Sequence, residues 1–564
     1  MTALLDKAAF YILFRDKKKK IAHFLRTTTR DSLSSELHIS LVQEIVTSIP
    51  LERIFDASSI QDSTHEQPYW SEKSFQAHLA RTHPDIIIPD TAIEVLWSCF
   101  CFYAFHPFPF SAADDRKVEL PAFDRGLLLL SRQGTRLFGT VHDDFGRCWG
   151  RLDEPCNCGR RMNRIFRSIS RVDRASSAGP QCDGFDTFVT DDMINAILAT
   201  FPFHPKLYPS LEQVQPLTQN LLGGRTGQYA IRAGDFAALL SLIMRLRVSG
   251  TTYDQNCHYG LLEEPSADTE ELVGILVRSF SRDQDEYLAP EMVLRALDIL
   301  PNLEQSFHQL WATLFQPGPS TERPNLEPAS SLDTMDAILH AVSLFIPPFQ
   351  THQRSELARR VKLIAFHNCY DARFRDPTDN LDLRHILQQA THNSPTGRAY
   401  LILLLGNHAQ DSDKVVVGAF FRDAPTTDDK APPERGRSTV AHPYLLFQLQ
   451  PQFSLFRWAG GRSSRPLSPE DEDGSATGHT EHRNCLGDPG GSRVAVEIDA
   501  STGQATFLRG TVHAAGALSG GYEELTRKDD RTASVHEWQT DFTVSRVAVF
   551  GVEGGPTYAC QSPW

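Results

Sequence analysis

Residues that could bind a metal or attack a substrate are few, and the first set is a group of cysteines. Cys148, Cys156 and Cys158 lie close together, and Cys182 or His258 could complete four ligands. Thiolates and imidazoles are the ligands that zinc usually takes in proteins. Here, however, two cysteines are one residue apart and no second close pair follows, which is unusual for zinc. Free thiols are therefore favoured over a zinc site.

A second candidate is a cysteine with a nearby histidine, Cys369 and His367 in the stretch "HNCYD". A histidine can activate a thiol as a nucleophile if the two side chains meet. In a strand, residues two apart share a face, so contact would be possible. The preceding "SELARRVKLIAF" has a helical period, and residues two apart on a helix do not face each other. A structural cysteine is therefore the favoured interpretation.

Two acidic stretches are faintly similar to calcium-binding loops. Such a loop needs a glycine at position 6 and a glutamate at position 12. Counting from Asp183, these positions hold Phe188 and Ile194, and counting from Asp283, position 12 is Leu294. Both segments could be EF-hand-like in helix arrangement, but the pattern predicts no bound calcium.

The same region contains a helix-start signal. Thr190 can cap a helix, and Asp191 and Asp192 would then lie favourably in its first turn. The sequence therefore predicts that a helix begins at Thr190.

The remaining motifs of common enzymes do not occur in this chain. It contains no phosphate-binding loop, no GxSxG turn and no HExxH metal pair. We therefore predict no catalytic, cofactor-binding or metal-binding residues, and a protein that is not an enzyme. The formal net charge of −14 makes nucleic-acid backbones poor partners. None of the ten cysteines forms a CxxC pair, which is typical of reduced thiols in the cytoplasm.

One basic run interrupts this acidic composition, at Lys17, Lys18, Lys19 and Lys20. It follows an apolar segment, and this order is opposite to that of a secretory signal. Basic residues beside an apolar helix face can bind anionic lipid weakly. More often such a run is the solvated end of a helix. We expect a cytoplasmic protein without a membrane-spanning segment, and a weak membrane-surface contact through these lysines is the alternative.

The elements that would position any site change in character along the chain. Residues 1–315 are predicted to be mainly helical. The segment "DFAALLSLIMRLR", for example, places Phe236, Leu239, Leu240, Ile243 and Leu246 on one stripe. The nearly continuous apolar run "TAIEVLWSCFCFYAF" predicts a buried helix.

A proline-rich linker is predicted over residues 316–331, because this segment holds four prolines and no hydrophobic period. After one further amphipathic helix, "LDTMDAILHAVSLFI", the chain consists of short apolar runs of strand length. Two polar inserts, near 422–440 and 460–484, separate them and are predicted to be disordered. The last run, from Trp538, is predicted to pair inside the sheet, so that truncation before Trp538 would unfold it.

The order of these runs resembles that of a TLDc domain. "VVVGAFF", "LLFQLQP", "VEIDAS" and "WQTDFTVSRVAVFGV" are similar to its successive strands, and Phe550 and Gly551 stand where TLDc domains usually carry Trp-Gly. The fungal restriction of telomere capping protein 5 family is the branch that they resemble most. "YWSEKSFQAHL", "YAFHPFPF" and "LPAFDRGLLLLSRQGTRLFG" occur in the same order in the helical region of that family.

This resemblance implies an α+β protein. Residues 1–315 would form an EF-hand-like helical region without calcium ligands, and residues 332–557 a TLDc domain, a two-sheet β-sandwich flanked by helices. TLDc proteins bind the peripheral sector of the vacuolar proton-pumping ATPase, and some promote its disassembly. Others are linked to oxidation resistance, and the telomere in the family name is a genetic association. The implied location is the cytoplasm, with peripheral contact at the vacuole membrane.

The chain also departs from the family. "AFHNCYDARFRDPTDNLDLRHILQQ" replaces a strand and a Gly-Ser segment, and a glycine-rich loop is reduced to "CLGDPGG". Thr2 stands where family members often carry a glycine for myristoylation. Two other functions are the alternatives: a thiol or zinc enzyme that protects against oxidation, and an adaptor at a lipid surface.

Overall fold

The computed structural model describes most of the chain, with gaps. The described residues are 18–44, 50–61, 67–108, 117–131, 154–170, 185–200, 209–223, 229–252, 258–281, 286–316, 333–346, 362–371, 381, 383, 386, 399–408, 413–421, 443–459, 484–488, 494–509, 521–526 and 538–553. The predicted linker after Gln316 and most of the two predicted polar inserts lie outside this set.

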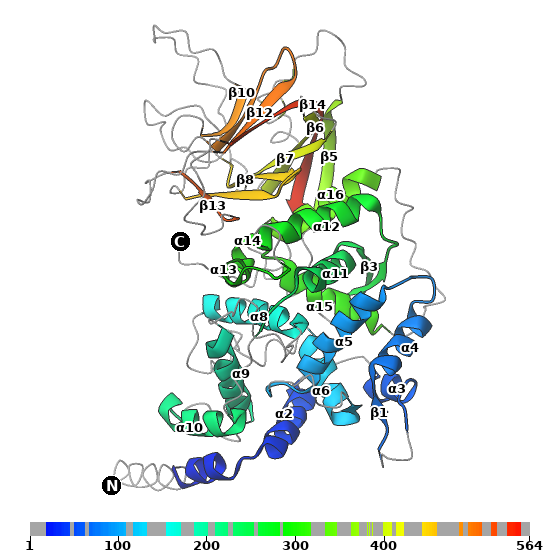
Figure 1. Ribbon diagram of the computed structural model, residues 1–564, viewed down its shortest axis with the longest axis vertical. Coiled ribbons are helices and arrows are strands. Elements are labelled where there is room, and N and C mark those ends of the chain that lie inside the picture. Colours follow the sequence, from blue (N-terminus) through cyan, green and yellow to red (C-terminus); the bar gives the residue numbers. More distant parts are fainter. Residues whose placement is uncertain are drawn as a thin grey trace, which may run out of the picture.

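The structure is a mixed α and β fold, with helices at one end and a large sheet at the other (Figure 1). The helices are α2 (Arg30–Glu44), α3 (Leu51–Asp56), α4 (Glu72–Thr82), α5 (Asp90–Ala104), α6 (Leu120–Leu130), α8 (Glu154–Ile169), α9 (Phe185–Ala199), α10 (Leu211–Leu222), α11 (Ala233–Met244), α12 (Ala267–Phe280), α13 (Pro290–Leu294), α14 (Ala296–Ile299), α15 (Leu303–Leu314) and α16 (Asp333–Phe345). None of the helices formed by the described residues has the length and apolar character needed to cross a membrane.

Short and long strands complete the fold. They are β1 (Tyr69–Trp70), β2 (Val118–Glu119), β3 (Leu246–Thr252), β4 (His258–Leu262), β5 (Lys362–Asp371), β6 (Ala399–His408), β7 (Lys414–Phe421), β8 (Leu445–Gln450), β9 (Ser454–Trp458), β10 (Asn484–Asp488), β11 (Val494–Ile498), β12 (Gln504–Arg509), β13 (Tyr522–Glu524) and β14 (Trp538–Glu553). β1 pairs with β2, β3 pairs with β4, and β5 to β14 form one sheet.

Aromatic side chains build the core of the helical region. Helix α5 is buried almost all round, as its apolar sequence predicts. Its Phe100 ring lies 6.5 Å from Trp70 and 5.9 Å from Phe315, measured between ring centroids. The Trp70 indole nitrogen donates a hydrogen bond of 2.8 Å to the Phe55 carbonyl, so this large side chain leaves no buried donor unsatisfied.

The predicted stripe on α11 is confirmed for four of its five residues. Phe236, Leu239, Leu240 and Ile243 are buried on this helix. Leu246 is buried too, but it is the first residue of strand β3 and not part of the helix. The helix ends because Leu246 and the residues after it pair with β4.

The large sheet is antiparallel at every pairing and has the strand order β10-β11-β12-β14-β6-β7-β8-β9-β13, with β5 also paired to β14. Strand β14 lies in its centre. Residues 538–543 of β14 pair with β12, residues 546–553 with β5, and residues 542–552 with β6 on the opposite edge. The prediction that the last strand pairs inside a sheet is therefore confirmed.

Both faces of the central strands are buried, which explains their continuous apolar sequences. In β6, Leu401 and Leu403 belong to the core shared with the helices, whereas Ile402 belongs to a second core. This second core also contains Phe507 of β12, whose ring centroid lies 5.9 Å from that of Phe456 in β9. The sheet thus curls until its two halves pack on each other, although hydrogen bonds connect all its strands.

Helix α16 joins the helical region to the sheet. Its Phe345 ring lies 4.8 Å from Phe447 and 5.1 Å from Phe453, between centroids. The Asn302 side-chain amide, from the start of α15, donates to the carbonyls of Ser343 (2.8 Å) and Ile346 (2.6 Å) at the end of α16. These contacts satisfy carbonyls that a helix end otherwise leaves without partners.

Candidate functional site

The cysteines considered for zinc do not come together in the described residues. Cys156 and Cys158 lie on helix α8. His258 is the first residue of β4, and Cys148 and Cys182 fall outside the described residues. Within the described part of the chain, no three His, Cys, Asp or Glu side chains converge in a way that could hold a metal ion.

The expected helix before "HNCYD" is wrong for residues 362–366, because they begin strand β5. Pairing with β14 decides this, since Lys362 to Asp371 lie opposite Glu553 to Arg546. The register shifts where Cys369 lies, between Asn368 and Tyr370, which pair with Ala548 and Val547. This register shift is a β-bulge, at which the regular pairing of the two strands is interrupted.

The helix predicted to begin at Thr190 begins earlier, at Phe185. Phe188 and Ile194 lie on this helix, and Asp183 and Asp283 fall outside the described residues. Asp191 and Asp192 are therefore in the middle of α9, not in its first turn. Their charges have local partners on α8 in place of the helix dipole.

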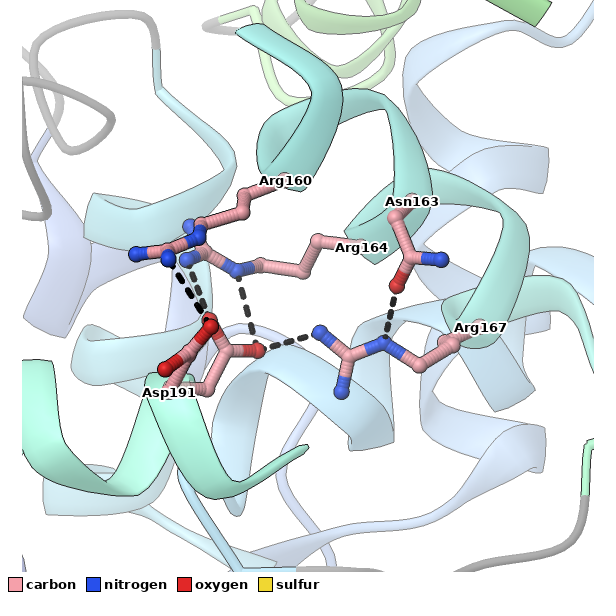
Figure 2. A network of polar contacts seen from close by, with 6 residues as sticks. Arg160, Asn163, Arg164, Arg167 and Asp191 are labelled. Atoms are coloured by element: carbon pink, nitrogen blue, oxygen red, sulfur yellow. Dashed lines mark hydrogen bonds and ion pairs between the residues drawn. The ribbon is translucent and has the colours of Figure 1, made fainter. Parts of the chain in front are cut away.

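These partners form a network of arginines and carboxylates between α8 and α9, which we call the arginine network (Figure 2). Arg160, Arg164 and Arg167 recur at helical spacing in the segment "GRRMNRIFR", so they lie along one side of α8. Figure 2 shows their side chains extending from α8 toward the carboxylates of α9. Sequence reasoning missed this site, although the arginine spacing was a usable signal.

Asp192 is the centre of the arginine network. Its Oδ1 accepts a hydrogen bond of 2.6 Å from Arg164 Nη2, and its Oδ2 accepts one from Arg167 Nη2. Burial alone would raise the pKa of Asp192, but Arg164 and Arg167 outweigh it and hold that pKa well below its usual range. Asp192 is therefore a permanent carboxylate and does not exchange protons near neutral pH.

The other members of the network extend it to neighbouring elements. Arg167 Nε donates to Asn163 Oδ1 at 2.7 Å, and its guanidinium lies 5.5 Å from the Phe102 ring of α5. Arg161 Nε contacts Glu304 Oε1 of α15 at 2.5 Å. Because each contact is buried or nearly so, the network fixes how α5, α8, α9 and α15 pack. The arginine network therefore has a structural role, because each of its fixed charges has a partner of opposite charge.

Three buried histidines of the helical region, His78, His83 and His106, are held neutral. Burial lowers the pKa of His78 and of His83 to about 4, and that of His106 to about 3. His78 Nε2 lies 3.1 Å from the Leu314 carbonyl at the end of α15, while Arg81 donates to His78 Nδ1 at 3.3 Å. His78 therefore carries its proton on Nε2 and links α4 to the C-terminus of α15.

The environment of the Cys99 thiol does not suit a nucleophile. Cys99 is fully buried in α5, and burial raises its pKa far above the ordinary value. Its sulfur lies 3.1 Å from Ser168 Oγ. A thiol in this environment stays protonated, whereas a catalytic cysteine needs a lowered pKa.

An exposed polar surface lies on the sheet, on the side of β12 and β14 that faces away from the second core. We call it the outer face. Thr506 Oγ1 donates to Asp541 Oδ1 at 2.7 Å, and Gln504 Nε2 donates to Thr543 Oγ1 at 2.8 Å. The same strands send Phe507 and Phe542 into the second core. The members of the outer face are Glu497, Gln504, Thr506, Gln539, Asp541 and Thr543.

The comparisons with known proteins identify no relative. No protein-family model, no curated protein and no solved structure matches the chain.

Proposed function

We propose that the chain is a non-catalytic interaction protein of the TLDc class, whose sheet docks on the peripheral sector of a vacuolar proton-pumping ATPase. Its location would be cytoplasmic, with peripheral contact at the vacuole membrane. The link to telomere capping implied by the resemblance would be indirect, because the acidic chain is a poor partner for nucleic acid.

The observation that carries this proposal is the central position of β14. The segments that resemble TLDc strands lie on β7, β8, β11 and β14, and all four belong to one curled sheet. β14 has strand partners along both of its edges. A scaffold of this kind, with two apolar cores and one polar face toward solvent, supports a docking role.

The arrangement of four helices supports the EF-hand-like part of the proposal. α10 and α11, and α12 and α13, form two helix–loop–helix units. The chain just before α11 pairs with the chain just before α13: Ala233 N donates to the Glu286 carbonyl at 2.7 Å, and Leu288 N donates to the Ile231 carbonyl at 2.9 Å. Arg232 and Tyr287 form an antiparallel bridge at this contact. An EF-hand is likewise a helix–loop–helix unit.

The outer face is the part of the sheet that we propose as the docking surface. The other half of the curled sheet packs on the helices through Phe447 and Phe345, and charged pairs such as Lys414–Asp268 (2.7 Å) line the edge of this contact. The helices therefore occupy that half. A partner would reach Thr506 and Asp541 of the outer face without displacing any described element.

Capture of the purified peripheral sector by the immobilised full chain tests this proposal. The double variant Thr506→Arg, Asp541→Arg places two long cations on the outer face and should abolish capture. Its matched control is Glu212→Arg, Gln219→Arg on exposed positions of α10, which adds the same charges far from the sheet and should capture normally. Failure of the wild-type chain to capture the sector would contradict the proposed partner. Equal capture by the two double variants would contradict the proposed surface.

A further inference from the structure

A carboxyl group without a hydrogen-bond donor lies on α6, a helix that packs against α3 (Figure 1). Asp124 is on α6 between Phe123 and Arg125, and both of these neighbours are buried. Its Oδ1 atom is also buried, and it accepts no hydrogen bond from any residue that the structure describes. A carboxylate oxygen that is removed from water and has no donor is costly, so burial favours the protonated form of this group.

The charge that acts on Asp124 from the facing helix has the same sign. Glu52 lies in the first turn of α3. The two helices are in contact, since the ring centroids of Phe55 and Phe123 lie 5.3 Å apart. Burial and, to a smaller extent, the Glu52 carboxylate raise the pKa of Asp124 to about 6. Asp124 therefore keeps its proton at a mildly acidic pH at which most aspartates have lost theirs.

No cation on the described elements around α6 compensates this repulsion. Of the charged residues on α2, α3, α5 and β2, which pack against α6, Glu52 is the one whose charge shifts the pKa of the buried carboxyl group. Arg125, the next residue on α6, donates instead to the carbonyls of Ala104 (2.7 Å) and Ser34 (3.0 Å). Burial and Arg125 lower the pKa of His38 on α2, which weakens it as a source of positive charge.

Helix α3 is the element that a change in this contact would affect first. It has six residues, too few to be stable through its own backbone hydrogen bonds. Trp70 Nε1 donates to the Phe55 carbonyl at 2.8 Å, and Arg81 Nη1 donates to the Ala57 carbonyl at 2.7 Å. Packing against α6 therefore holds α3 in place, and with it these two contacts to neighbouring elements.

We propose that the carboxyl group of Asp124 is a proton-operated latch: in its neutral form it lets α3 pack on α6, and in its ionised form it loosens α3. The proton moves between this carboxyl group and solvent. Ionisation draws water toward the buried oxygen and adds repulsion from Glu52, and both effects favour separation of the two helices. The latch requires neither the vacuolar ATPase nor the outer face, so it goes beyond the proposed function.

The latch acts in the direction opposite to ordinary acid denaturation. Because the pKa of Asp124 is about 6 in the folded state and 3.8 ordinarily, the folded state binds more protons between these values. The stability that this proton provides is present at about pH 4 and is lost as the pH rises through about 6. His78, whose pKa burial lowers to about 4, contributes with the opposite sign, so the latch is best measured in the His78→Gln background.

Melting temperatures of the full chain with and without Asp124→Asn test the proposal. Asparagine is neutral at every pH, whereas Asp124 ionises. Between about pH 4.5 and about pH 7.5, the difference between the two proteins should therefore change in favour of the variant, by about 2–4 °C. Comparing the two differences removes any constant cost of the buried amide. An equal difference at both pH values would overturn the proposal.

Two further variants separate charge from packing. Glu52→Gln removes the like charge and leaves Asp124 in place, so the loss of stability with rising pH should begin at a higher pH less readily than in the wild type only if repulsion is absent; its size should shrink. Phe55→Leu weakens the same helix contact without removing a charge and is the matched control, because it should lower the melting temperature equally at both pH values. A larger pH-dependent loss in Glu52→Gln than in the wild type would overturn the proposal.

Hydrogen exchange locates the effect. At about pH 7.5 the amides of α3 should exchange about 10-fold faster in the wild type than in Asp124→Asn, and this ratio should approach one at about pH 4.5. Comparison at the same pH cancels the intrinsic exchange rate. The amides of β14, in the sheet, should show a ratio near one at both pH values. Faster exchange in other elements with α3 unchanged would overturn the latch.

Discussion

The arginine network and the outer face both bring polar side chains of two neighbouring elements together, but water reaches only the second. At α8 and α9, the side chain of Asp192 is 3% exposed and contacts two arginines that are 5% and 2% exposed. On β12 and β14, the Thr506–Asp541 hydrogen bond is exposed to solvent. The comparison teaches that burial determines the role: a buried charge must keep its partners, while an exposed one remains available to another molecule.

The largest effect should come from removing the central charge of the arginine network. Asp192→Ala would leave Arg164 and Arg167 buried without their shared carboxylate, and should lower the free energy of unfolding by about 3–5 kcal/mol. Urea denaturation of the full chain measures this. The control is Asp191→Ala, because the Asp191–Arg160 pair is more exposed and should contribute about 1 kcal/mol. Similar losses in both variants would mean that burial does not distinguish the two pairs.

A pH titration of stability should reveal the contribution of the buried His78. His78 has a pKa of about 4 in the folded state, below its usual 6.5, so the unfolded state binds more protons between these values. Stability should therefore fall as the pH falls from 6.5 toward 4, by up to about 3 kcal/mol for this residue. His78→Gln, which cannot titrate, should reduce that slope in urea denaturation series.

An identical pH dependence in the wild type and in His78→Gln would show that His78 does not contribute.

A smaller loss is expected where the sheet meets α16. A Cβ atom added to Gly418 would lie 2.2 Å from the Phe447 ring, which in turn contacts Phe345 of α16. Gly418→Ala should therefore push Phe447 against α16 and cost about 1–3 kcal/mol. Thermal denaturation checks this, and Gly234→Ala is the control, because a Cβ at Gly234 meets no atom within 4 Å. An unchanged melting temperature for Gly418→Ala would mean that the sheet and α16 are less tightly packed than the structure shows.

The smallest change in stability should occur on the outer face. Asp541→Asn weakens hydrogen bonds from Thr506 and Gln539 that water can replace, and should change the free energy of unfolding by less than about 0.5 kcal/mol. A loss above 2 kcal/mol in urea denaturation would assign the outer face a structural role like that of the arginine network.

Elements with a strong apolar pattern were predictable from the sequence, and elements that depend on distant partners were not. The buried stripe from Phe236 to Ile243 and the central strand from Trp538 follow from side-chain periodicity. The helix expected before His367 was wrong because the pairing of β5 with β14 outweighs a helical period. The arginine network was missed because Arg164 and Asp192 are 28 residues apart, and charged residues alone do not indicate that they are buried.

The sequence by itself determined which segments are apolar on one side and which on both, since a side chain's period follows from local backbone geometry. It also determined the cluster of cations between Lys17 and Arg30. Only the tertiary structure decided that the arginines of α8 are buried against α9 while the lysines of residues 18–20 face solvent. The physical reason is that neighbours from distant parts of the chain exclude water from the arginines of α8, which makes these cations structural. The lysines of residues 18–20 remain exposed to solvent.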